Sequence, residues 1–157
     1  MAKFVQFNHE EVPRKLLKSG QYIKIDENGS SKYSKIDKID SVKTGKHGSA
    51  KTIVESKDIP NNATRFVTLT TDDTAVVVKM VKVTTKLIDF VDGSIITIKD
   101  ENNNFIEFYV DTEMSEQDKE KIQDTLDAYP DCEEFDFVFR ALPGYYKVDS
   151  IKPARNL

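Results

Sequence analysis

Residues 35–54 read KIDKIDSVKTGKHGSAKTIV, and this stretch predicts a β-hairpin with a basic turn. Isoleucine and valine recur among lysines over Lys35–Val42, and a β-branched run begins again at Thr52–Val54, so both segments are expected to be strands. Between them, Gly45 and Gly48 permit positive φ angles and a close approach of the chain. The hairpin is therefore expected to present a lysine and a histidine at its tip.

Similar runs continue on both sides of this hairpin. Tyr22–Ile25, Arg65–Leu69 and Ala75–Val83 are β-branched or aromatic segments separated by Asn, Asp, Gly and Pro, and the last reads as one uninterrupted strand. Short strands at this spacing predict a small β-barrel for the first part of the chain.

A second group of strands follows. Lys86–Val91 and Ser94–Ile98 flank Asp92-Gly93, which is a signal for a two-residue hairpin turn. Asp100–Asn104 makes the next turn, and Phe105–Val110 follows it as another strand. This half of the chain therefore repeats the β-rich style of the first half.

One helix is expected near residues 115–129. Ser115 is a suitable N-cap with Asp118 three residues later, and the apolar residues Ile122, Leu126 and Tyr129 fall on one helical face. Pro130 ends the helix, and Glu134–Leu142 is a strand with three phenylalanines on one face. Strands, one helix and a closing strand are typical of an oligonucleotide-binding (OB) barrel. The fold class is thus mainly β, with domains at residues 1–83 and 84–157.

The charge differs between these two parts. Residues 1–83 contain 15 lysines and arginines against 10 acidic residues, whereas residues 84–157 contain 8 against 17. A basic first domain favours contact with a polyanion. A charge difference without functional meaning is the alternative, since many soluble proteins have one.

The sequence offers no catalytic constellation, and we expect neither an enzyme nor a cofactor or metal. Histidine occurs only at positions 9 and 47, and Cys132 is the single cysteine, so a cysteine–histidine zinc site cannot form. Gly45-Lys46 resembles the end of a phosphate-binding loop, but Asp40 and His47 stand where that loop needs a glycine and a hydroxyl residue. With no signal region and no membrane-spanning run, a cytoplasmic location is expected.

Two interpretations of the turn remain on these residues alone. Lys46 and His47 could form the tip of a probe that enters a narrow polyanionic cavity, with Lys43 and Lys51 at its base contacting phosphates. The same residues could equally form a basic turn with no special tip. Three more lysines lie along the strand that leads into the turn: Lys32, Lys35 and Lys38.

The whole stretch resembles the signature loop of a known family, the hypusine-containing translation factors called initiation factor 5A. The residues that match are Lys43, Thr44, Gly45, Lys46, His47, Gly48, Ser49, Ala50 and Lys51. Weaker similarity covers Lys18–Ile23, Asp89–Gly93 and Tyr129–Glu134, so the resemblance extends along nearly the whole chain. It implies an SH3-like first domain and an OB-fold second domain.

The resemblance also implies a function. In the family, deoxyhypusine synthase uses NAD to transfer an aminobutyl group from spermidine to the loop lysine, here Lys46, and in eukaryotes deoxyhypusine hydroxylase hydroxylates the product. The factor binds the ribosome between the P and E sites. Its hypusine reaches the acceptor end of the P-site tRNA and promotes peptide bond formation at stalling sequences such as proline runs, and termination.

Some residues depart from the family pattern. Residues 27–31 lengthen an early turn, the proline usual near the domain junction is absent, and Tyr145-Tyr146-Lys147 with a short tail replaces the usual C-terminal helix. An alternative hypothesis is therefore a diverged paralogue that binds RNA or the ribosome without the modification. An enzyme has only the Gly-Lys dipeptide in its favour.

Overall fold

The computed structural model describes residues 5–43 and 50–154, which form two compact units. Phe7–Lys79 is the first unit, and the chain from Met80 onward belongs to the second. Each unit contains one antiparallel sheet, and within the described residues there is a single α-helix, so the mainly β fold class is confirmed. The domain boundary predicted from the sequence, after Val83, lies inside the first strand of the second unit.

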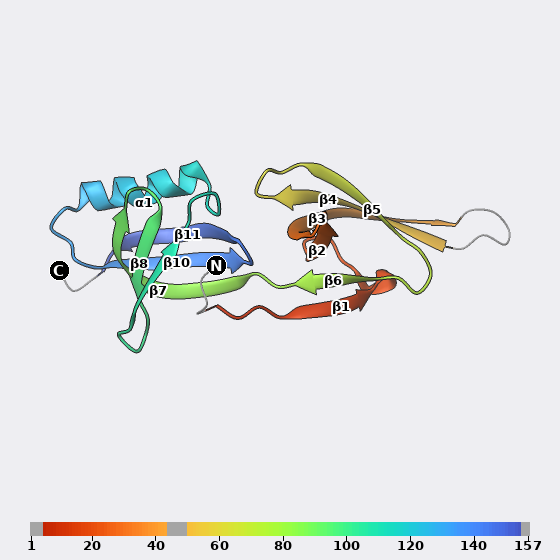
Figure 1. The fold of residues 1–157 in the computed structure, drawn as a ribbon, viewed down its shortest axis with the longest axis horizontal. Coiled ribbons are helices and arrows are strands. Elements are labelled where there is room, and N and C mark those ends of the chain that lie inside the picture. Colours follow the sequence, from red (N-terminus) through yellow and green to blue (C-terminus); the bar gives the residue numbers. More distant parts are fainter. Residues whose placement is uncertain (1–4, 44–49, 155–157) are drawn as a thin grey trace. The chain divides into compact units, whose positions relative to one another are not determined.

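The first unit is a six-stranded sheet with a short 3-10 helix, η1 (Figure 1). Its strands follow the order β1-β6-β2-β3-β4-β5, and all neighbours are antiparallel. The elements are β1 (His9–Pro13), η1 (Arg14–Leu16), β2 (Tyr22–Glu27), β3 (Ser30–Lys43), β4 (Ala50–Ile59), β5 (Thr64–Leu69) and β6 (Thr74–Val78).

A β-bulge in β3 explains the three-residue spacing of its isoleucines. Residues three apart in a regular strand point to opposite faces. Here the register shifts between Ile36 and Lys38, so that Ile36 lies opposite Ser56 and Ile39 lies opposite Val54. Ser56 and Val54 share one face of β4, and the bulge therefore brings both isoleucines to the core side. The core of the unit consists of Val12, Leu17, Ile23, Ile36, Val54, Leu69 and Val77.

The expected uninterrupted strand over Ala75–Val83 is wrong. β6 ends at Val78 and β7 begins at Val81, and the two compact units meet between Lys79 and Met80. The apolar run is continuous in sequence, but its two parts pair with different sheets, β6 with β1 and β2, and β7 with β8 and β10. The residue types alone therefore do not indicate that the two parts pair with different sheets.

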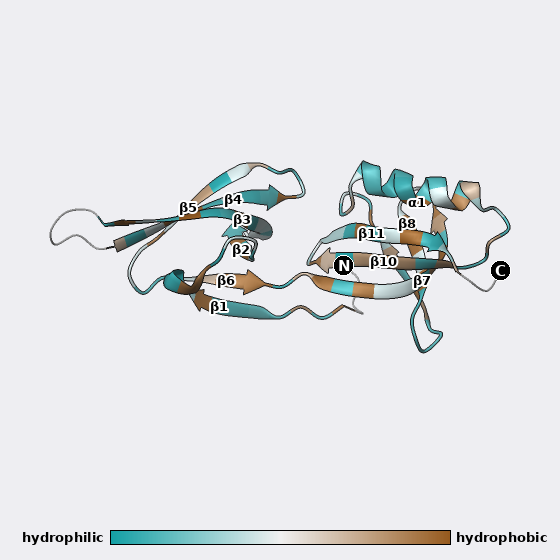
Figure 2. Cartoon of the chain, turned by 180° about the vertical axis from the view of Figure 1, so that it is seen from behind, coloured by the Kyte–Doolittle hydropathy of each residue, from teal (hydrophilic) through white to brown (hydrophobic). Residues whose placement is uncertain are grey.

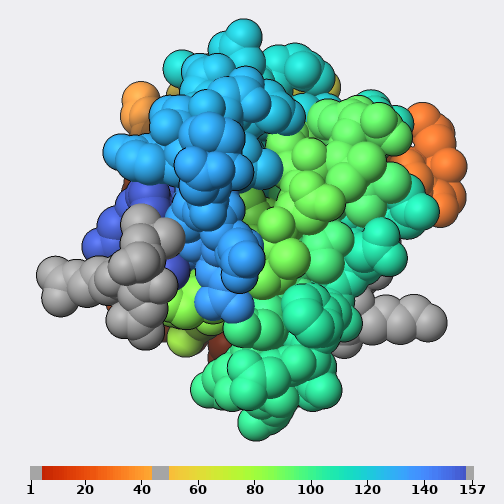
Figure 3. Space-filling model, turned by 90° about the vertical axis from the view of Figure 1, so that its left-hand side faces the viewer, coloured from red at the N-terminus to blue at the C-terminus, as the bar shows by residue number. Residues whose placement is uncertain are grey.

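The second unit is a five-stranded sheet in the order β11-β10-β7-β8-β9. Its helix comes between β9 and β10, the third and fourth strands of this unit in sequence order. Its elements are β7 (Val81–Val91), β8 (Ile95–Lys99), β9 (Phe105–Tyr109), α1 (Glu116–Ala128), β10 (Phe135–Leu142) and β11 (Tyr145–Pro153). The strand expected after the helix is β10, and β11 is a further strand for which the sequence analysis made no prediction. Figure 3 shows this unit with the turn between β8 and β9, in teal green, at its lower edge.

Local signals predict the turn and the helix cap correctly. Asp92 and Gly93 have φ values of 55° and 66°, and the amide of Ser94 donates to the carbonyl of Val91 at 3.1 Å, which is a type I′ turn. The hydroxyl of Ser115 accepts a hydrogen bond from the amide of Asp118 at 3.1 Å. This side-chain bond satisfies one of the unpaired amides at the start of α1.

Aromatic rings fill the core of the second unit. Phe137 and Phe139 are fully buried with ring centroids 5.2 Å apart, and Phe108 lies 5.0 Å from Tyr146. The helix contributes Ile122 to this core, whereas Tyr129, predicted on the same face, lies beyond the helix end and is 49% exposed. Figure 2 shows that α1 is mainly hydrophilic (teal), whereas β6 of the first unit is hydrophobic (brown).

Candidate functional site

The predicted site lies where β3 ends and β4 begins. Of its nine residues, Lys43, Ala50 and Lys51 are described, while Thr44, Gly45, Lys46, His47, Gly48 and Ser49 lie outside the described residues. The ladder between the two strands continues to its last pair, Lys43 opposite Ala50. The structure therefore defines the base from which this connection starts.

The last part of the hairpin is a two-stranded ribbon. β2 pairs with β3 only up to Lys35, and β5 pairs with β4 only from Thr52 onward. Residues 41–43 are exposed, as is Lys51, and Figure 1 shows both strand ends side by side beyond the neighbouring strands. The ribbon thus extends past its sheet, and its last described residues are exposed to solvent.

The two lysines at the base point to opposite faces of this ribbon. Lys51 lies opposite Val42, so these two side chains share a face. Lys43 is the next residue after Val42 and therefore projects to the other face. The predicted pair of guiding lysines thus places one positive charge on each side of the ribbon.

A buried arginine holds the ribbon at the point where it leaves the sheet. Arg14, in η1, is only 9% exposed, and its Nη1 donates a hydrogen bond to Oγ1 of Thr52 at 3.1 Å. The amide of Arg14 also donates to the carbonyl of Asp73 at 3.3 Å. Thr52 is the residue directly after Lys51, so Arg14 fixes β4 beside the base of the loop.

The carboxylate of Asp73 completes this region. It accepts hydrogen bonds from the amide and the hydroxyl of Thr70 at 2.7 and 2.9 Å. These bonds, chiefly the one from the amide, lower the pKa of Asp73, and the positive charge of Arg14 acts in the same direction. Arg14 could not be predicted from the sequence, because an arginine beside Lys15 in Pro-Arg-Lys-Leu gives no sign of which cation is buried.

An ion-pair cluster at the opposite end of the hairpin supports the sheet. The guanidinium of Arg65 donates to both carboxylate oxygens of Asp58 at 2.9 and 3.0 Å, and to Glu27 at 2.8 Å. The hydrogen bond from Arg65 is the main cause that lowers the pKa of Asp58, whose side chain is 8% exposed. The cluster joins β2, β4 and β5 and has a structural role.

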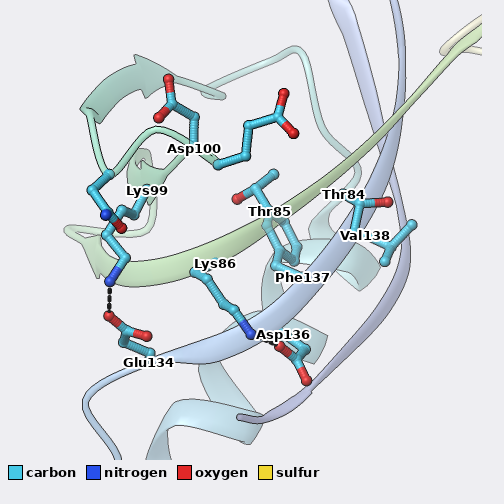
Figure 4. Close-up of a pocket in the computed structure, with 11 residues that line it drawn as sticks. Thr84, Thr85, Lys86, Lys99, Asp100, Glu134, Asp136, Phe137 and Val138 are labelled. Carbon is cyan, nitrogen blue, oxygen red and sulfur yellow. Dashed lines mark hydrogen bonds and ion pairs between the residues drawn. The ribbon is translucent and has the colours of Figure 1, made fainter.

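The second unit contains an open cavity of about 370 Å³, bordered by β7, β10 and the turn after β8 (Figure 4). Both of its lysines are engaged, Lys86 with Asp136 and Lys99 with Glu134. Its wall also holds the buried hydroxyl of Thr85, which has no hydrogen-bond partner within the described part of the chain. Because its cations are neutralised, the cavity lacks the charge that a phosphate ligand would require.

The described residues show neither a metal-binding cluster nor a membrane-spanning helix. No three His, Cys, Asp or Glu side chains come together there as ligands for a metal ion. Along the same residues, no helix combines the length and apolar character needed to cross a bilayer.

The comparison with known proteins gives a result only at the level of structure. No family model and no curated protein matches the sequence. A solved structure from Naegleria fowleri, described as a translation initiation factor eIF-5A family protein, is similar with a TM-score of 0.70 and 24% identity, over 92% of this chain and 98% of that one. The chain has the fold of translation initiation factor 5A. The structure of eukaryotic translation initiation factor 5A from Methanococcus jannaschii is also similar, with a TM-score of 0.59 and 20% identity over 91% of this chain and 94% of its own.

This likeness confirms the two domain folds predicted from the sequence. Initiation factor 5A structures combine an SH3-like domain with an OB-fold domain, and the matches cover more than nine-tenths of the present chain. The five strands and the helix position of the second unit agree with the OB-fold.

Proposed function

We propose that this chain is a ribosome-binding translation factor of the initiation factor 5A family that acts through a hypusine at Lys46. One observation carries the proposal: the nine-residue stretch that resembles the family's signature loop joins β3 to β4 in a chain with that family's fold. The structural similarity extends over more than nine-tenths of the chain and therefore does not rest on the nine motif residues alone.

The base of the loop supports the proposal physically. The ribbon extends beyond its neighbouring strands and carries Lys43 and Lys51 on opposite faces, so phosphates on either side of it would meet a positive charge. Arg14 ties the ribbon to the body of the unit through Thr52. A lysine carried on such a ribbon can enter the deep pocket of deoxyhypusine synthase.

The modified side chain would act by positioning. An aminobutyl group lengthens Lys46 and adds a cationic amine, which can donate hydrogen bonds to phosphate or ribose oxygens at the acceptor end of the P-site tRNA. Peptide bond formation would stay with the ribosome, helped by better placement of the tRNA at stalling sequences such as proline runs, and release at termination would benefit in the same way. The factor itself would hold no cofactor and would work in the cytoplasm.

A charge-preserving substitution tests this function. Lys46→Arg keeps the positive charge but removes the amine that the synthase modifies, and Lys43→Arg makes the same change at the base of the loop. In cells depleted of the native factor, a reporter with a proline run should be translated with the Lys43→Arg protein and not with the Lys46→Arg protein. Equal translation with both variants would contradict the proposal and favour a paralogue that works unmodified.

A further inference from the structure

The outer face of β3, β4 and β5, opposite the core, gathers lysines around one exposed aromatic ring. Strand alternation and the bulge at Asp37 place Lys35 and Lys38 together on this face, whereas Lys32 lies on the other one. The basic aromatic face, as we name it, consists of Lys35, Lys38, Lys51, Lys57 and Phe66.

The lysines of this face are largely unneutralised. Lys35 lies directly opposite Lys57, and neither has an ion pair within the described residues. Lys35 stands 5.9 Å from the ring centroid of Tyr22, and Lys57 donates a hydrogen bond to the hydroxyl of Thr64. Like charges that face each other across a sheet are destabilising. Their presence here points to a negatively charged ligand rather than to a structural role.

Three carboxylates share the face but do not cancel its charge. Asp37 follows Ile36, whose side chain points to the core, and therefore lies on the outer face. Asp40 lies 3.7 Å from the ammonium of Lys38, and Glu55 lies between Lys38 and Phe66. Four lysines against three acids leave the face with a net charge of +1. It also continues to Lys51 at the base of the loop.

Phe66 is the apolar part of this face. Its side chain is 64% exposed on β5, an edge strand of the sheet, and Thr64 and Thr68 lie on either side of it on the same face. An exposed phenylalanine beside unpaired lysines can stack on an unpaired base while the lysines contact the phosphates. Paired bases inside a duplex do not offer a free face to such a ring.

We propose that the basic aromatic face binds single-stranded RNA, with one base stacked on Phe66 and the phosphates held by Lys35 and Lys57. The proposal rests on the proposed function only in taking RNA as the partner. It concerns a surface of the sheet and does not depend on the modification of Lys46.

The stacking contact is tested with the full-length, unmodified protein and a labelled single-stranded RNA of about twelve nucleotides. Phe66→Leu keeps an apolar side chain but removes the aromatic ring. Phe105→Leu is the matched control, because Phe105 is 67% exposed on a strand of the acidic second unit. By fluorescence anisotropy, Phe66→Leu should weaken binding about 5- to 100-fold, and Phe105→Leu should not change it. Equal affinities for wild type and Phe66→Leu, or no binding by the wild type, would overturn the proposal.

The phosphate contacts are tested by the dependence of affinity on salt. In the double variant Lys35→Gln/Lys57→Gln, the slope of log K against log salt should become shallower by about 1.4, or about 0.7 for each lost phosphate contact on a single strand. Lys121→Gln/Lys147→Gln makes the same charge change on exposed positions of the second unit and should leave the slope unchanged. Equal slopes for the two double variants, or displacement of the RNA by polyglutamate at equal charge concentration, would overturn the proposal. Because these measurements use free RNA, their failure leaves the reporter test of Lys46 unaffected.

Discussion

Replacing Arg14 by methionine should loosen the strand that carries the candidate loop. Nη1 of Arg14 donates a hydrogen bond to the hydroxyl of Thr52. Arg14 is only 9% exposed and Thr52 only 2%, so water cannot easily replace either partner of this bond. A hydrogen bond from a charged donor contributes about 1.5–3 kcal/mol. The free energy for opening β4 should fall by this amount, which corresponds to amide exchange about 10- to 150-fold faster.

Hydrogen exchange with mass spectrometry on the full-length protein measures this effect locally, in peptides that contain β4. Lys15→Met is the matched control, since Lys15 is the exposed neighbour of Arg14 in the same short helix and should leave the exchange unchanged. Thr52→Val removes the other partner. The double variant Arg14→Met/Thr52→Val should lose less stability than the sum of the two single variants. Each single variant leaves one buried polar group without its partner, whereas the double variant removes both groups.

Equal amide exchange in β4 for Arg14→Met and Lys15→Met would show that Arg14 does not hold this strand. Effects of Arg14→Met and Thr52→Val that simply add would mean that the two side chains do not interact.

Four further expectations concern contacts within each of the two units. Arg65→Met should lower the stability of the first unit by about 3–5 kcal/mol in calorimetry, because it leaves the buried carboxylate of Asp58 unpaired, whereas Glu27→Gln, at a more exposed partner, should cost at most about 1 kcal/mol. Because the folded-state pKa of Asp58 lies below its ordinary value of 3.8, this ion pair stabilises the unit above pH 3.8 and the contribution is lost as the pH falls through the lower folded-state pKa. Asp58→Asn should therefore flatten the acid side of the stability profile of the first unit, and an unchanged profile would contradict the assignment. In the second unit, Phe137→Ala should cost about 3–5 kcal/mol as a fully buried ring is lost, measured as a lower unfolding temperature. Ser115→Ala should cost about 1 kcal/mol through the lost helix cap and should speed amide exchange in the first turn of α1 only.

Features that depend on neighbouring residues could be predicted from the sequence. The Asp92-Gly93 turn and the Ser115 cap have signals within four residues, and the structure contains both. The alternation of three phenylalanines over Phe135–Phe139 likewise predicted the buried face of β10. In each case the residues that cause the structure lie next to one another in the chain.

Features set by distant partners could not be predicted in this way. The break at Lys79–Met80 depends on which sheet each half of one apolar run joins. The bond between Arg14 and Thr52 spans 38 residues, and no pattern near either residue indicates the other. The placement of Lys32 and Lys38 on different faces has a similar cause, since the bulge between them arises from pairing with β4. For the candidate site, the motif could be recognised in the sequence. The extended ribbon and its hydrogen bond to Arg14 could be found only in the structure.

The mass of the peptide that contains Lys46, in protein purified from its own cells, tests the proposed function with the fewest assumptions. We predict a mass addition located on Lys46 by fragmentation, equal to an aminobutyl group with or without one oxygen atom, and no addition on Lys43 or Lys51. An unmodified Lys46 in protein that is active in translation would contradict this prediction.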